Sequence, residues 1–303
     1  MKVSQIVIEL LTACNFNCPY CRDASGEKKN ISLDDAKKLV DTFAELGVNK
    51  VQLDGGETFL YKDIFKLIQY IVSKNMKVGI YSNASVITEE MALRLAEFSS
   101  IKLCVTIHPL NPQDQIESTF TGIANLKSKG IYPQIVYVVS SKSYEKLPEI
   151  LERLPKGKYK INLNPIVQSG RAVDNGVSPL SKEQSQEFVK IVEKARKQYP
   201  DLDIMDNVLV KQEELKIENI QMNEDGEFAL HINTDGYVLP FFSADNSTAI
   251  GNVNDLENLK KTMKDKETIE YLEKCRLAMK KRIEGEYDSN SRKIERSEIV
   301  KIV

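Results

Sequence analysis

The chain has 303 residues, which is enough for one large α/β domain and a smaller second unit. Its 42 basic and 44 acidic residues nearly cancel, so we expect no partner among nucleic acids or anionic membranes. No stretch is apolar over the length of a transmembrane helix, and the N-terminus enters a strand-like run without a signal-peptide pattern, so we expect a cytoplasmic protein. The five cysteines are a poor disulfide framework, and their number suits a metal site.

Strand-like and helical stretches alternate from the N-terminus to about residue 200. The predicted strands cover residues 4–11, 49–53, 77–82, 101–107, 134–139 and 160–165. The predicted helices cover residues 33–46, 62–74, 88–98, 113–129, 144–153 and 181–198. Ser32 and Thr88 are candidate N-caps, and Gly47 and Gly130 are candidate helix ends. Such strand–helix units in series predict parallel strands with right-handed crossovers.

The alternation stops after about residue 203. Residues 203–208 are a candidate for one more strand. Residues 228–233 and 237–241 predict a hairpin with Asp235-Gly236 in its turn, and a helical stretch is predicted at about residues 255–284. We therefore expect one domain over residues 1–210 and a smaller α+β region over residues 211–303.

Cys14, Cys18 and Cys21 lie in one short stretch directly after the first predicted strand. Thiolates are soft ligands that favour zinc, copper(I) or iron–sulfur clusters. A structural zinc ion almost always takes four protein ligands, and no fourth cysteine or histidine is nearby in the sequence. A zinc loop that takes a distant fourth ligand is one interpretation. Three cysteines and a vacancy fit better a four-iron cluster with one iron left open.

Two motifs together resemble those of the radical S-adenosylmethionine (SAM) enzymes. One is the C-x₃-C-x₂-C spacing with Tyr20 before the last cysteine, and the other is Gly55-Gly56-Glu57 directly after the second predicted strand. The resemblance implies a partial (βα)₆ TIM-like barrel whose active groups sit at the C-terminal ends of the strands. It also implies one [4Fe-4S] cluster on Cys14, Cys18 and Cys21, which cleaves SAM reductively to a 5′-deoxyadenosyl radical that abstracts hydrogen from a substrate.

The same resemblance assigns residues to SAM. Glu57 is expected to accept the ammonium group of the methionyl moiety, and Gly55 and Gly56 to let the backbone approach it. The remaining expected contacts are Tyr20, Ile166 and Val167 near adenine, Ser82 and Asn83 at the end of the third strand, and Thr106 at the ribose.

Strand periodicity places Cys104, Thr106 and His108 on the barrel face of the fourth predicted strand, and the aliphatic residues between them toward the helices. Thr106 either contacts the ribose or merely fills the barrel. His108 stands with Pro109 where relatives often carry Asp-Gly, and it is either a proton carrier near the substrate or a residue bonded to backbone. Cys104 is either a small buried hydrophobe or a hydrogen-atom donor to a substrate radical, and the same alternatives hold for Cys275.

The C-terminal region resembles a SPASM or twitch domain, in the hairpin around Asp235-Gly236 and in Ile250-Gly251-Asn252. Phe241 stands where a cluster cysteine is expected, so the resemblance implies a degenerate domain without an auxiliary cluster. The implied substrate is a peptide or a small natural-product intermediate, with a redox-neutral outcome favoured, and the implied electron donor is a flavodoxin or a ferredoxin. The alternative is a non-catalytic iron–sulfur and SAM-binding protein, against which the intact Gly-Gly-Glu motif argues.

Overall fold

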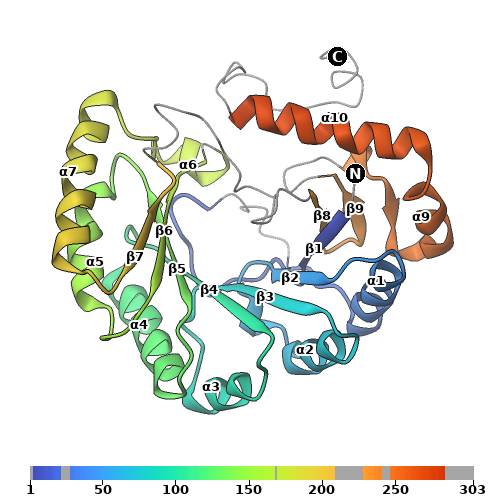
Figure 1. The fold of residues 1–303 in the computed structure, drawn as a ribbon, viewed down its shortest axis with the longest axis horizontal. Helices are drawn as coiled ribbons and strands as arrows, with labels where there is room; N and C mark the ends of the chain where they lie inside the picture. The colour runs from blue at the N-terminus through green and yellow to red at the C-terminus, as the bar shows by residue number, and fades with distance from the viewer. Residues whose placement is uncertain (1–2, 22–27, 168, 209–227, 241–245, 284–303) are drawn as a thin grey trace.

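A computed structural model describes residues 3–21, 28–167, 169–208, 228–240 and 246–283. Its described strands form one curved sheet in the order β10-β9-β8-β1-β2-β3-β4-β5-β6-β7 (Figure 1). The strands are β1 (Val3–Glu9), β2 (Lys50–Asp54), β3 (Lys77–Ser82), β4 (Ile101–Ile107), β5 (Gln134–Val139), β6 (Lys160–Pro165), β7 (Asp203–Asp206), β8 (Phe228–Ile232), β9 (Tyr237–Leu239) and β10 (Gly251–Asn252). All neighbouring strands from β8 through β1 to β7 are parallel. This is a mixed α/β fold with a partial TIM-barrel-like sheet, as the sequence predicted.

The helices that connect the parallel strands cover the outer face of the curved sheet (Figure 1). They are α1 (Leu33–Glu45), α2 (Ile64–Ser73), α3 (Glu89–Ala96), α4 (Gln113–Ser128), α5 (Leu147–Arg153) and α7 (Lys182–Gln198), whereas the single turn α6 (Arg171–Asp174) lies near the barrel mouth. The predicted helix starts are confirmed, because the Ser32 side chain accepts a hydrogen bond from Asp35 N and that of Thr88 from Met91 N. Gly47 and Gly130 follow α1 and α4 with φ of 84° and 78°, a conformation that favours glycine.

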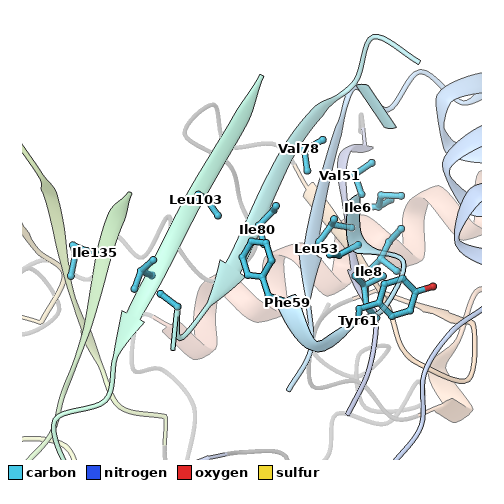
Figure 2. Packing of buried hydrophobic residues seen from close by; sticks show 14 of the residues in the cluster. Ile6, Ile8, Val51, Leu53, Phe59, Tyr61, Val78, Ile80, Leu103 and Ile135 are labelled. Atoms are coloured by element: carbon cyan, nitrogen blue, oxygen red, sulfur yellow. The ribbon is translucent and has the colours of Figure 1, made fainter. Parts of the chain in front are cut away.

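The core lies between the sheet and these helices, and alternate strand residues build it. Ile6, Ile8, Val51, Leu53 and Ile80 have no exposed surface and point together (Figure 2). Each such side chain contributes about 1.5–3 kcal/mol by leaving water. The alternation on β4 is as predicted, with Leu103, Val105 and Ile107 buried in this core and Cys104, Thr106 and His108 half-buried.

The C-terminal region continues the same sheet. β8 pairs in parallel with β1, with Leu230 opposite Ile6 and Ile232 opposite Ile8, and β9 then pairs antiparallel with β8. The predicted hairpin is therefore present, and its β8 strand joins the edge that β1 would otherwise leave open. The predicted division between residues 210 and 211 falls on residues that are not described, and it stays a prediction.

The structure corrects one predicted element and adds another. The helical stretch expected over residues 255–284 is divided in two, because α9 (Leu256–Thr262) and α10 (Lys266–Ile283) are separate helices. The side chain of Asp265 accepts a hydrogen bond from Thr268 N at 3.1 Å, which starts a new helix at this point. Periodicity also missed the single turn α6, which lies beside the cysteine stretch. Within the described ranges, no helix is both long and apolar enough to span a membrane.

Candidate active site

The stretch from Cys14 to Cys21, called here the cysteine loop, follows β1 at the end where the parallel strands finish. Its two ends are fixed by backbone hydrogen bonds, from Thr12 N to Lys29 O at 2.9 Å and from Arg171 N to Cys21 O at 3.0 Å. The Asn175 amide also donates to Pro19 O at 2.8 Å. The loop is thus held from the β1 side and from the α6 side.

Nitrogen donors point at the sulfurs of Cys14 and Cys18. Phe16 N donates to Cys14 Sγ at 3.3 Å, and the side-chain amide of Asn111 donates to Cys18 Sγ at 3.1 Å. Burial raises the pKa of the Cys18 thiol to about 12, although the Asn111 hydrogen bond lowers it, and burial also raises the pKa of Cys14. With pKa values raised in this way, the two thiols keep their protons near pH 7 unless a metal centre displaces those protons. The N–H donors around the sulfurs, by contrast, suit deprotonated thiolates.

The donor set matches the cofactor that the sequence implies. Three cysteines, with N–H donors on the sulfurs of Cys14 and Cys18, fit an iron–sulfur cluster, whose thiolates accept such bonds. A cluster spreads its thiolates over several iron atoms, so its ligands lie farther apart than those of a single ion. Among the described residues, no group of three or more histidine, cysteine or acidic side chains is placed to hold one metal ion.

The Gly55-Gly56-Glu57 turn packs against the strand end that leads into the cysteine loop. Gly56 N donates to Leu11 O at 2.8 Å, and Glu57 N donates to Ala13 O at 3.0 Å. A Cβ atom at Gly56 would overlap the Ala13 carbonyl, and one at Gly55 would overlap the Leu11 carbonyl. The two glycines are therefore needed for a close backbone approach within the protein, and their expected approach to SAM stays a prediction.

Glu57 links the ends of two strands below the cysteine loop. The side chain is 1% exposed, and its carboxylate accepts hydrogen bonds from Phe59 N at 3.0 Å, Ser82 Oγ at 2.7 Å and Asn83 N at 2.7 Å. Burial raises the pKa of this carboxyl, whereas the three donors lower it. One lone pair of Oε2 is left after these bonds, which is what the expected ammonium contact needs.

At the end of β3, Ser82 contacts Glu57 and Asn83 also reaches the cysteine loop, while the expected contact of both residues with SAM stays a prediction. The Asn83 amide donates to Asn15 Oδ1 at 3.1 Å and lies 4.0 Å from Cys14 Sγ. The structure therefore brings the cysteine motif, the Gly-Gly-Glu motif and the β3 end into one contact network.

Tyr20 and His108 meet across the mouth of the barrel. Tyr20 Oη and His108 Nδ1 are 3.0 Å apart, and Phe16 packs edge-on against the same imidazole at 6.2 Å between centroids. Burial lowers the pKa of His108 to about 4, so the ring is neutral near pH 7 and its partner is a side chain. Neither interpretation of His108 from sequence included this tyrosine.

The remaining predicted residues divide into two groups. Ile166 packs with Tyr20, Ala172 and Val177 in a small cluster at the barrel mouth, whereas Val167 is 59% exposed. Thr106 is half-buried on the inner face of β4.

The two other cysteines lie apart from each other. Cys104 Sγ lies 3.8 Å from Gln134 Oε1, on the inner face of the sheet. Cys275 has no exposed surface and packs in the main core with Leu272. That packing favours the interpretation of Cys275 as a core residue.

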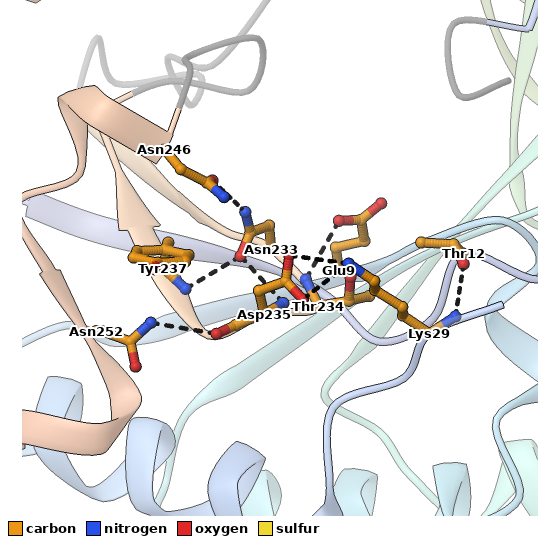
Figure 3. A network of polar contacts seen from close by, with 9 residues as sticks. All are labelled: Glu9, Thr12, Lys29, Asn233, Thr234, Asp235, Tyr237, Asn246 and Asn252. Carbon is orange, nitrogen blue, oxygen red and sulfur yellow. Dashed lines mark hydrogen bonds and ion pairs between the residues drawn. The ribbon is translucent and has the colours of Figure 1, made fainter. Parts of the chain in front are cut away.

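The turn of the C-terminal hairpin lies against the base of the cysteine loop (Figure 3). Lys29 Nζ pairs with Asp235 at 3.3 Å, and Thr234 N donates to Glu9 Oε2 at 3.4 Å. Lys29 N also donates to Thr12 Oγ1 at 2.9 Å. The hairpin thus contacts both chain segments that enter and leave the loop.

The functional neighbours that sequence reasoning missed are Asn111, Arg171 and Asn175. Asn111 and Asn175 lie in irregular connections, where neither strand nor helix periodicity applies, and Arg171 begins the single turn α6. Asn111 follows β4 in the segment His108-Pro109-Leu110-Asn111, at the point where the sequence departs from the Asp-Gly of relatives. That departure was the sequence signal that could have pointed to Asn111.

Comparison with known proteins assigns a family to this region. The family model of the Radical SAM superfamily matches residues 8–154. The AdoMet-dependent heme synthase of Methanosarcina barkeri is 27% identical over 57% of this chain and 54% of its own length. The mycofactocin maturase MftC of Mycolicibacterium smegmatis is 23% identical over 61% of this chain and 51% of its own length. The chain thus spans about half the length of these two relatives.

Solved structures share the fold. Streptococcus suis SuiB bound to S-adenosylmethionine superposes with a TM-score of 0.66 at 18% identity, covering 88% of this chain and 66% of that chain. SuiB bound to the precursor peptide SuiA gives a TM-score of 0.61 at 19% identity, covering 79% of this chain and 59% of that chain.

Proposed function

Residues 8–154 of this chain belong to the Radical SAM superfamily, and on that basis we propose that the protein is a radical SAM enzyme. The proposal extends to one [4Fe-4S] cluster on Cys14, Cys18 and Cys21 and to SAM beside it. When bound, these cofactors supply an electron and a 5′-deoxyadenosyl radical that abstracts hydrogen from a substrate.

One observation carries the proposal: the cysteine loop and the Gly-Gly-Glu turn are joined by direct hydrogen bonds. Glu57 N bonds Ala13 O next to Cys14, and the Glu57 carboxylate fixes Asn83, whose amide reaches Asn15. Motifs far apart in sequence thereby form one built site at the C-terminal ends of β1, β2 and β3, where such barrels carry their active groups.

The chain's own residues then have distinct tasks. Phe16 N and the Asn111 amide stabilise negative charge on Cys14 and Cys18. Oε2 of Glu57 is proposed to accept the ammonium group of SAM. Tyr20 and Ile166 form an apolar surface for adenine and exclude water beside it.

We propose a peptide or a small natural-product intermediate as the substrate. MftC is a mycofactocin maturase and SuiB binds the precursor peptide SuiA, which supports a peptide substrate here. The heme synthase of M. barkeri supports a small molecule. Cys275 is the only cysteine beyond Cys104, so an auxiliary cluster has too few ligands, and a redox-neutral outcome is favoured. A flavodoxin or ferredoxin is proposed as the electron donor.

The test is anaerobic reconstitution with iron and sulfide, followed by dithionite and SAM. We expect release of 5′-deoxyadenosine and methionine from the wild type, and neither from Cys18→Ala. Cys275→Ala is the matched control, since this thiol lies in the core, and it should retain the release. A wild type that takes up the cluster and binds SAM without cleaving it would support the non-catalytic alternative.

A further inference from the structure

The side-chain amide of Asn111 donates a hydrogen bond to the sulfur of Cys18. Its Nδ2 lies 3.1 Å from Cys18 Sγ, and the residue is 7% exposed. Cys18 is itself 6% exposed, so water competes little for the sulfur. The hydrogen bond therefore acts at low dielectric, where it is electrostatically strong.

The orientation of the amide is fixed by a second partner. The other Nδ2 proton is donated to Gln115 Oε1 at 2.9 Å, in the first turn of α4. Within the part of the chain that the structure describes, Oδ1 of Asn111 is buried without a hydrogen-bond partner. The flipped amide would point a carbonyl at the sulfur and leave the NH₂ group unpartnered, so the donor faces the sulfur. Asn111 N also donates to His108 O at 3.1 Å, which holds the backbone of this connection against the end of β4.

A hydrogen bond to a cluster thiolate stabilises the state with more negative charge. One-electron reduction adds a negative charge that is shared by the sulfurs, so the N–H donor favours the reduced cluster. We propose that Asn111 is a positioning residue that raises the reduction potential of the cluster through Cys18, with Gln115 holding its amide in place. This inference rests on the proposed function, because it requires the cluster.

The test is potentiometric titration of the reconstituted protein, followed by the paramagnetic signal of the reduced cluster. Asn111→Leu keeps the approximate volume and removes the donor. We expect the equilibrium constant for reduction to fall about tenfold, which corresponds to a potential lower by ~59 mV. Gln115→Leu keeps the donor but frees the amide to rotate, so its potential should fall by a smaller amount. If Asn111→Leu does not fold, the reduction potential of Gln115→Leu tests the proposal in its place.

Asn125→Leu is the matched control. Asn125 lies on α4, the helix that carries Gln115, and its side-chain amide donates to Ile87 O at 2.9 Å instead of to the cysteine loop. The reduction potential of the cluster in Asn125→Leu should equal that of the wild type. A shift in the Asn111 and Gln115 variants that is absent from the control supports the inference.

Two results would overturn it, and they are distinguishable. If the wild type takes up a four-iron cluster and the Asn111→Leu potential equals that of the control, the tuning role is wrong and the proposed function stands. If the wild type takes up no such cluster, both the proposed function and this inference fail.

Discussion

At the scale of single residues, the Tyr20–His108 contact fixes the cysteine loop to the end of β4. The pair is 3.0 Å apart and joins two segments that are far apart in sequence. Because Tyr20 is 8% exposed, few water molecules can replace its hydroxyl. The contact therefore contributes to the stability of the loop before any cofactor is considered.

Tyr20→Phe is expected to lower the free energy of unfolding by about 1–3 kcal/mol, because it leaves the imidazole nitrogen without its partner. Urea denaturation of the metal-free protein measures this change. Tyr132→Phe is the control, since that side chain is 49% exposed, and it should change stability by less than about 0.5 kcal/mol. Equal effects of the two substitutions would contradict the role of the pair.

His108 also predicts a pH dependence. Burial lowers its pKa from 6.5 to about 4 in the folded protein. Between these values the unfolded chain binds a proton that the folded protein does not, so stability falls as pH falls through this window. In His108→Gln that part of the slope should vanish. The comparison is made by urea denaturation at a series of pH values from 4 to 7, and identical slopes in both proteins would refute it.

Sequence reasoning was strong at residues that obey a period and weak elsewhere. The face of Cys104, Thr106 and His108 was predicted because a strand alternates. The hydrogen bond from Asn111 to Cys18 was not, because its donor lies in an irregular connection whose course depends on Pro109 and on the packing of α4. Long-range partners of this kind are set by the folded chain.

At the scale of elements, the turn after β2 depends on two glycines that approach the backbone of residues 11–13, which follow β1. Gly56→Ala places a methyl group on the Ala13 carbonyl, and backbone on both sides prevents a small adjustment. We expect a loss of more than about 2 kcal/mol of stability, in the range of severe overpacking, together with loss of iron uptake.

Gly130→Ala is the matched control for that substitution. Gly130 has φ of 78° and open space around its Cβ position, so alanine there is strained without meeting other atoms. Its cost should stay near 1–2 kcal/mol and iron uptake should be normal. Normal uptake in Gly56→Ala would show that the close approach is not needed for the site.

Helix boundaries were predicted where a cap residue is present, at Ser32 and Thr88. The break between α9 and α10 was missed, although Asp265 is itself a capping residue. The helical hydrophobic pattern continues across the break. Periodicity alone therefore does not reveal a capping residue within a helical stretch.

At the scale of the whole molecule, the C-terminal hairpin and the barrel share one sheet. Leu230 on β8 has no exposed surface and lies opposite Ile6 of β1. Leu230→Ala should therefore cost about 2–5 kcal/mol. The loss should appear in one cooperative thermal transition seen both by far-ultraviolet circular dichroism and by tyrosine fluorescence. Two separate transitions, with only the smaller one shifted, would instead support an independent C-terminal domain.

The order of strands and helices followed from the sequence because each parallel unit is local. The pairing of β8 with β1 did not, since it joins segments more than two hundred residues apart, on either side of undescribed residues 209–227. The Asp-Gly turn predicted the hairpin and gave no information on which strand it would join.

The central claim is that three sulfurs at the barrel mouth hold a four-iron cluster with an iron open to SAM. Electron paramagnetic resonance of the anaerobically reconstituted, dithionite-reduced protein tests it most directly. We predict the signal of a reduced [4Fe-4S] cluster that changes shape when SAM is added and is absent from Cys18→Ala. A reconstituted wild type that carries zinc, or a cluster signal that SAM leaves unchanged, would contradict the account.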